Sequence, residues 1–132
     1  MSSEESPADA HTTVAEVAAR LRRFNRARDW EQFHTPKDLA VALSVEAGEL
    51  LEAFLWKREG DALDQQAIEE ELADVLICAV NLAQRLSIDL MAAVDRKIDR
   101  NAERYPVAQA RGSADKHDVL ARRARERGEE PT

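Results

Sequence analysis

The side chains that could do chemistry in this chain are acidic residues placed among apolar ones. In the stretch VALSVEAGELLEAFLWK, Glu46 falls in the middle of an apolar helical arc and Glu49 flanks it. The stretch EEELADVLICAV repeats the pattern, with Glu71 central and Asp74 offset. Each pair has the spacing i, i+3, which places both carboxylates on one helical face. Two such helices packed antiparallel would bring the four carboxylates together.

A cluster of four carboxylates needs a positive partner. An ionised carboxylate in an apolar core is costly unless it is paired or binds a metal, and like charges at close range repel one another. An all-oxygen set of ligands selects hard cations, which predicts Mg²⁺ first and Mn²⁺ second.

Two other uses of acids in a helical bundle compete with this prediction. In the first, Glu46 and Glu71 form structural salt bridges with Arg or Lys from another helix, although two matching pairs favour a metal site. A di-iron bundle, by contrast, needs a Glu-x-x-His step, and this chain has none. The three histidines, at positions 11, 34 and 117, also lie outside the two acidic helices, which argues against a His-rich transition-metal site.

Four helices are expected to position the acids. Helical periodicity, N-cap residues and breakers such as Pro and Gly set their bounds. The expected helices run from Thr13 to about Ala27, from Thr35 and Pro36 to about Arg58, from about Asp64 to Leu86, and from Ser87 or Asp89 to Tyr105. Short connections between them predict an all-α four-helix bundle.

The second expected helix also has an apolar strip on the face away from Glu46. Val41, Leu51 and Leu55 form this strip. A small monomer would have little use for a second apolar face, so the strip predicts an oligomer.

Composition sets further limits. Charged residues make up 34% of the chain and its formal net charge is −7, which argues against nucleic acid as a partner. The single cysteine, Cys78, permits no internal disulfide, and no apolar run has the length of a membrane span. We expect a cytoplasmic protein with a disordered leader at 1–11, one helical domain at 12–106 and a charged tail at 107–132, either mobile or forming a short surface helix.

A second group of polar residues accompanies the acids. Lys97 and Asn101 share a face of the fourth helix, and Tyr105 lies close by. They could bind the phosphates of a polyphosphate, or Lys97 could simply extend its charge into water. Trp30 and Trp56 are the only tryptophans, and they could stack on a nucleobase or fill a core or an interface.

Three stretches together resemble a known family. RDWEQFHTPKDLAVALSVEAGELLEAFLWK, EEELADVLICAVNLA and KIDRNAERYP are similar to the MazG-like all-α nucleoside triphosphate pyrophosphohydrolases, most closely the dCTP pyrophosphatase branch. The resemblance covers residues 21–106 and implies hydrolysis of a nucleoside triphosphate to the monophosphate and pyrophosphate, in a homotetramer built as a dimer of dimers. It implies Mg²⁺ ligands at Glu46, Glu49, Glu71 and Asp74, and substrate-binding or catalytic residues at Trp30, His34, Trp56, Lys97, Asn101 and Tyr105.

Two positions depart from the dCTP pyrophosphatases. Those proteins carry a His where this chain has Leu21 and a Tyr where it has Cys78, so the groups available to bond a base edge differ. The substrate is therefore expected to be dCTP or a modified or oxidised dNTP. Glu49 is the expected general base, because the offset member of a pair could leave one oxygen free. A nucleotide-binding sensor without turnover and a helical interaction module remain the alternatives.

Overall fold

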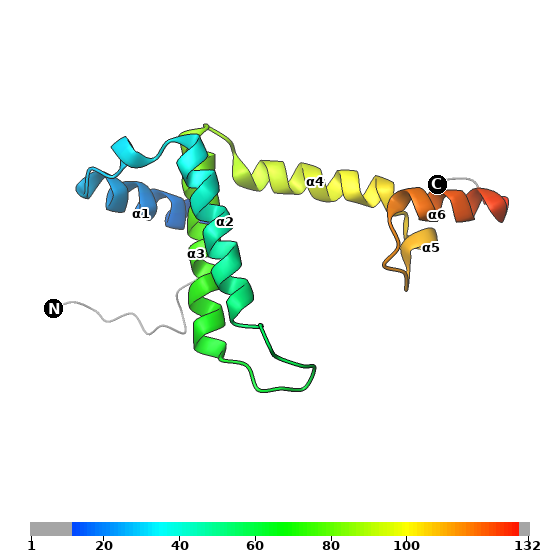
Figure 1. Ribbon diagram of the computed structural model, residues 1–132. Helices are drawn as coiled ribbons and strands as arrows, with labels where there is room; N and C mark the ends of the chain where they lie inside the picture. Colours follow the sequence, from blue (N-terminus) through cyan, green and yellow to red (C-terminus); the bar gives the residue numbers. More distant parts are fainter. Residues whose placement is uncertain (1–11, 130–132) are drawn as a thin grey trace. The chain divides into compact units, whose positions relative to one another are not determined.

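The computed structural model describes residues 12–129, and within that range it contains helices and no strand. The all-α prediction is confirmed. The predicted leader at 1–11 lies outside the described residues. The chain divides between Ile88 and Asp89 into two compact units. The elements are α1 (Val14–Ala27), the 3₁₀ turn η1 (Glu31–Phe33), α2 (Pro36–Glu52), α3 (Gln65–Arg85), α4 (Leu90–Arg104), α5 (Val107–Ala110) and α6 (His117–Glu126) (Figure 1).

Side-chain caps start the four long helices. Thr13 and Glu16 form the predicted capping box of α1, each side chain accepting from the other's backbone N–H. Thr35 caps α2, Asp64 caps α3 and Asp89 caps α4, each accepting from the backbone N–H three residues on. Such caps satisfy N–H groups that have no partner inside the helix. Of the two predicted caps for α4, the structure therefore selects Asp89.

Helix α2 is shorter than predicted. It was expected to reach Arg58, but it ends at Glu52. The next residues form turns instead, in which the N–H of Phe54 donates to the carbonyl of Leu51. Trp56 then adopts a φ of 65°, a left-handed conformation that a helix cannot include. Hydrophobic periodicity continues past Glu52, so it could not show where the backbone leaves the helix.

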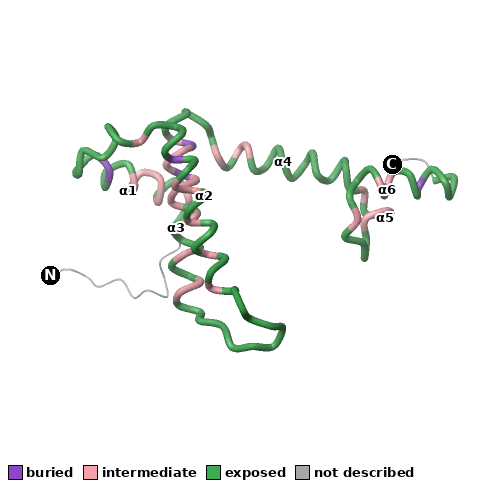
Figure 2. The backbone as a smooth tube through the Cα atoms, viewed as in Figure 1, coloured by how far each residue is buried: buried purple, intermediate pink, exposed green. Residues whose placement is uncertain are grey.

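In the first unit, α2 and α3 lie side by side, and α1 packs against α3 (Figure 1). Leu39 of α2 and Val80 and Ala83 of α3 are the buried apolar residues of this unit. They cluster toward one end of the helix pair, where α1 and η1 also lie (Figure 2). Among the polar contacts that join α1 to α3, the side-chain amide of Asn25 donates to the side-chain oxygen of Asn81 over 3.1 Å.

The second unit contains α4, α5 and α6. The segment after Pro106, predicted to be a mobile tail or a surface helix, forms two helices that contact each other. Leu120 and Ala124 of α6 are each only 3% exposed. An ion pair between Arg123 and Asp115 ties α6 to the loop that precedes it.

The residues of the predicted second apolar strip are exposed within this chain, although Leu55 lies in the turn after α2 and not on the helix. Val41, Leu51 and Leu55 expose 52%, 58% and 46% of their surface. Within residues 12–129, no single helix is long and apolar enough to cross a membrane, and only α3 and α4 taken together pass that test on length and composition.

Candidate functional site

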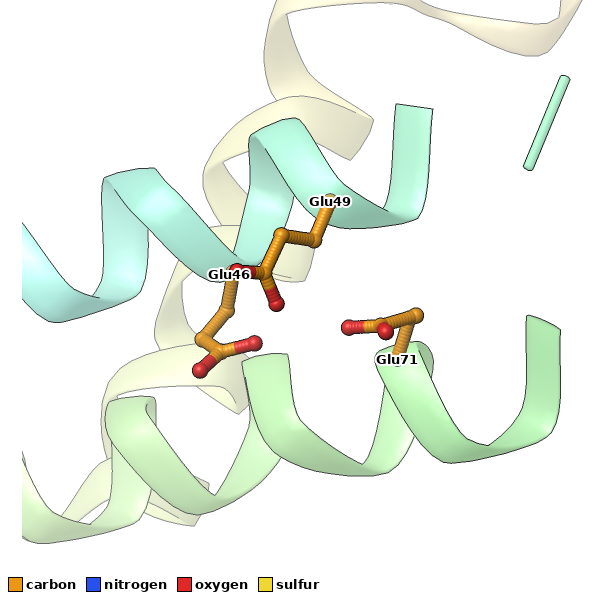
Figure 3. A group of neighbouring side chains, drawn as sticks. All are labelled: Glu46, Glu49 and Glu71. Atoms are coloured by element: carbon orange, nitrogen blue, oxygen red, sulfur yellow. The ribbon is translucent and has the colours of Figure 1, made fainter. Parts of the chain in front are cut away.

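Three of the four predicted acids meet between α2 and α3. Glu46 and Glu49 project from α2, and Glu71 projects from α3 toward them (Figure 3). One carboxylate oxygen from each lies within 4.8 Å of the others. The i, i+3 spacing places Glu46 and Glu49 on one face of α2, and the packing of α2 on α3 brings Glu71 to them, as predicted.

Two of these carboxylates have a buried oxygen without a partner. Glu46 Oε2 and Glu71 Oε2 are both shielded from solvent, and neither accepts a hydrogen bond. A buried acceptor left unpaired costs the full desolvation of the group, and more when the group is charged. Such atoms are rare in folded proteins, and a cation bound between the two carboxylates would satisfy them.

The proximity of the acids changes how they titrate. Hydrogen bonding with Glu49 first, and then burial and the neighbouring negative charges, raise the pKa of Glu46 from 4.5 to about 6. Burial, followed by the charges of Glu49 and Asp74, also raises the pKa of Glu71. In both cases burial and the neighbouring carboxylates disfavour the ionised form.

Asp74 lies outside the group of three but close enough to influence it. Its charge contributes to the raised pKa values of both Glu46 and Glu71. Cys78, one turn further along α3, is half-buried, and burial together with the charges of Glu46 and Asp74 raises the pKa of its thiol. A protonated thiol is a weak ligand and a weak nucleophile, so the chemistry of the site rests on oxygen.

The salt-bridge alternative needs an Arg or Lys beside these acids. Within residues 12–129 the ion pairs join Arg26 to Glu31, Arg123 to Asp115 and Arg127 to Glu129. None of them includes Glu46 or Glu71. The donor set and its unpaired oxygens fit a hard divalent cation, for which carboxylate oxygens are the preferred ligands.

The aromatic and imidazole residues predicted to bind substrate lie elsewhere in the first unit. Trp30 is 44% exposed and packs edge-on against Phe24, with ring centroids 5.6 Å apart. Trp56 is 96% exposed in the turn that follows α2. His34 follows η1 and lines a pocket beside α1 and α3. The two tryptophans do not fill the core of this chain.

The remaining predicted residues belong to the second unit. Lys97 and Asn101 lie on the exposed surface of α4, and Tyr105 is its C-cap residue. The Tyr105 ring packs edge-on against the ring of His117, at 6.0 Å between centroids. The sequence did not predict that contact, because α5 and a loop separate the two residues and no helical repeat relates them.

An all-α chain with three carboxylates gathered between two paired helices, and a fourth acid nearby, has the architecture expected of the all-α nucleotide pyrophosphohydrolases. The sequence profile of the MazG-like family matches residues 41–120, and the chain belongs to this family. The match extends beyond Pro106, where the resemblance seen in the sequence ended. The predicted family is therefore confirmed.

Named relatives agree with this assignment. The chain is 44% identical to rat dCTP pyrophosphatase 1 over 117 residues, covering 83% of this chain and 69% of the rat protein. It is 43% identical to human dCTP pyrophosphatase 1 over 115 residues, covering 82% and 68% of the two chains. A solved structure of a pyrophosphatase from Archaeoglobus fulgidus matches 74% of this chain and 95% of that one, with a TM-score of 0.68 and 40% identity. The chain is thus a hydrolase of the nucleoside triphosphate pyrophosphohydrolase class.

Proposed function

We propose that this chain hydrolyses a deoxynucleoside triphosphate between its α and β phosphates, using Mg²⁺ or alternatively Mn²⁺. The products would be the monophosphate and pyrophosphate, and the role would be cleansing of the nucleotide pool. The observation that carries the proposal is the pair of buried, unpartnered oxygens on Glu46 and Glu71. The relatives' names support dCTP as a substrate, while Leu21 and Cys78 support a modified or oxidised dNTP as the alternative.

Glu46, Glu49, Glu71 and Asp74 would hold the metal. When bound, a divalent ion neutralises phosphate charge and lowers the pKa of a coordinated water. Glu49 is the most exposed member of the group of three, whereas Glu46 and Glu71 are half-buried. An exposed carboxylate can keep one oxygen free toward solvent. We therefore propose that Glu49 orients the attacking water as general base.

Each unit carries residues that we propose, separately, as substrate contacts. Trp30 and Trp56 offer aromatic faces on which a base can stack, and His34 is an additional candidate contact. On α4, Lys97 would offset the charge that develops on the leaving phosphate, while Asn101 and Tyr105 would donate hydrogen bonds. We place the catalytic domain in residues 12–106, followed by the charged segment 107–132.

A homotetramer, arranged as a dimer of dimers, would cover the apolar surface that one chain leaves open. The exposed strip of Val41, Leu51 and Leu55 supports this assembly. Leu51→Glu would place a charge in that strip without touching the acids. A shift to a smaller species in light scattering is expected for this variant, while an unchanged mass would remove the strip from the interface.

The test is release of pyrophosphate and monophosphate from a panel of standard and oxidised dNTPs, with Mg²⁺ and with EDTA. Metal-dependent release of both products is expected, and the rank order gives the base preference. If no nucleotide is cleaved but one raises the melting temperature with Mg²⁺, the chain is a sensor. If neither hydrolysis nor a Mg²⁺-dependent thermal shift is seen, the interaction module is the better reading.

A further inference from the structure

A polar pocket of about 550 Å³ lies at the end of the first unit where α1 and η1 meet the C-terminal half of α3. Its lining includes Asn81, ten residues along α3 from Glu71. Ten residues of α-helix span about 15 Å. The pocket is therefore separate from the acidic group between α2 and α3.

The charge of this pocket is opposite to that of the chain. Arg22, Arg26 and Arg85 line it against a single acid, Glu31, whereas the chain as a whole has a formal net charge of −7. Arginines held around one cavity repel one another unless an anion or an acid lies between them. This local excess of positive charge would attract an anion.

Only part of that positive charge is offset within the described chain. Arg26 pairs with Glu31 over 3.3 Å, on the surface. The ion pairs among residues 12–129 include neither Arg22 nor Arg85. Arg85 is nevertheless held in place, because its Nε donates to the backbone carbonyl of His34 over 2.9 Å. One guanidinium edge is thus anchored, and its terminal nitrogens remain available as donors.

The walls of the pocket are fixed by hydrogen bonds between α1 and α3. Asn25 is only 5% exposed and donates to Asn81. The side chain of Gln84 donates to the backbone carbonyl of Ala18 over 2.7 Å. These two contacts set the spacing between Arg22 on α1 and Arg85 on α3. A pocket whose helices and whose Arg85 are already held in place loses less entropy when it binds an anion.

We propose that this pocket is a binding site for a compact phosphate oxyanion. Guanidinium groups donate in a planar fork that matches phosphate oxygens, which favours phosphate over a spherical anion. The lining is made of charged and polar side chains and includes no aliphatic or aromatic side chain apart from His34, so it does not suit a nucleobase or a lipid. The phosphate could belong to free pyrophosphate or orthophosphate, or to a nucleoside monophosphate. The site does not depend on the proposed hydrolysis, because its occupancy can be measured without metal.

Calorimetry with the full chain in EDTA tests this site. The titrants are inorganic pyrophosphate, orthophosphate and dCMP, and their rank order identifies the source of the phosphate. Saturable binding of at least one of them, at one site per chain, is expected. Arg22→Gln should weaken it by about tenfold, the value of one charge-assisted hydrogen bond.

The matched control is Arg23→Gln, which removes the same charge from the neighbouring position of α1. Arg23 is exposed and does not line the pocket, so the variant should bind as the unchanged chain does. No saturable binding of any of the three anions would overturn the proposal. Equal weakening in both variants would also overturn it, because the attraction would then come from the general charge of α1.

Discussion

Glu46 on α2 and Glu71 on α3 face one another, and each buries one carboxylate oxygen that has no hydrogen-bond partner. The arrangement destabilises the isolated chain, because two desolvated negative charges are held close together. It is well suited to binding a divalent cation, since the ligands are already assembled before the ion arrives. The same geometry therefore sets one expectation for activity and another for stability.

Replacing Glu71 by Gln separates these two effects. Glu71→Gln should lower metal-dependent hydrolysis by at least about 100-fold, because a charged oxygen ligand is lost. In EDTA its melting temperature should equal or exceed that of the unchanged chain, because a repulsive charge has been removed. Product release with Mg²⁺ and thermal unfolding in EDTA measure the two.

Glu70→Gln is the matched control for this variant. Glu70 is the preceding residue of α3, it is exposed, and its carboxylate accepts only from the side chain of Gln66. Its activity and melting temperature should stay close to those of the unchanged chain. A loss of folding in Glu71→Gln with unaltered Mg²⁺ affinity would instead assign Glu71 a structural role.

The raised pKa of Glu46 predicts how stability depends on pH in the absence of metal. This carboxyl titrates near pH 6 in the folded chain and near 4.5 when it is unperturbed. Between those values the folded state holds more protons than the unfolded state, so the free energy of unfolding should fall as pH rises. Urea unfolding in EDTA across this window measures the slope.

Glu46→Gln isolates that effect from other titrating groups. The variant lacks the carboxyl, so its stability should decline less across the same interval. The Glu71 carboxyl shifts in the same direction and should leave part of the slope in place. A slope that is identical in the variant and the unchanged chain would show that Glu46 titrates normally in the folded state.

The acidic group could be predicted from the sequence because two regular features determine it. Helical periodicity places Glu46 and Glu71 within apolar arcs, and those arcs must face each other when α2 packs on α3. The N-caps could also be predicted from the sequence, since Thr35 and Asp64 accept hydrogen bonds from residues only three positions away. The spacing of residues along the sequence is enough to predict such features.

Other features depend on contacts that spacing does not encode. The early end of α2 follows from the left-handed backbone of Trp56, a conformation that a bulky residue rarely adopts and that composition does not indicate. The arginine-lined pocket brings Arg22 and Arg85 together through the packing of α1 on α3. That packing includes the part-buried hydrogen bond between Asn25 and Asn81, two polar residues whose pairing no periodic pattern predicts.

The exposure of Trp56 predicts a change in substrate binding without a change in stability. Because the side chain is 96% exposed, Trp56→Ala should alter the free energy of unfolding by no more than about 0.5 kcal/mol. If the ring stacks on a base, kcat/KM should fall roughly five- to 150-fold, the equivalent of about 1–3 kcal/mol. Steady-state kinetics and urea unfolding measure the two quantities.

Lys57→Ala provides the comparison for that variant. Lys57 is the next residue, is also exposed, and has no proposed contact with substrate. Its kinetics should match those of the unchanged chain. Equal effects of the two substitutions would point to the conformation of the turn, and not to the aromatic ring, as the source of any loss.

The hydrogen bond between Asn25 and Asn81 predicts a stability effect of its own. Asn81→Ala leaves the buried amide of Asn25 without its partner and should lower the free energy of unfolding by about 1–3 kcal/mol. Gln66→Ala, an exposed change on the same helix, should stay within about 0.5 kcal/mol of the unchanged chain. The double variant Asn25→Ala/Asn81→Ala should lose less than the sum of the single losses, because each single change already removes the shared bond. Strictly additive losses in urea unfolding would show that the two amides do not depend on each other.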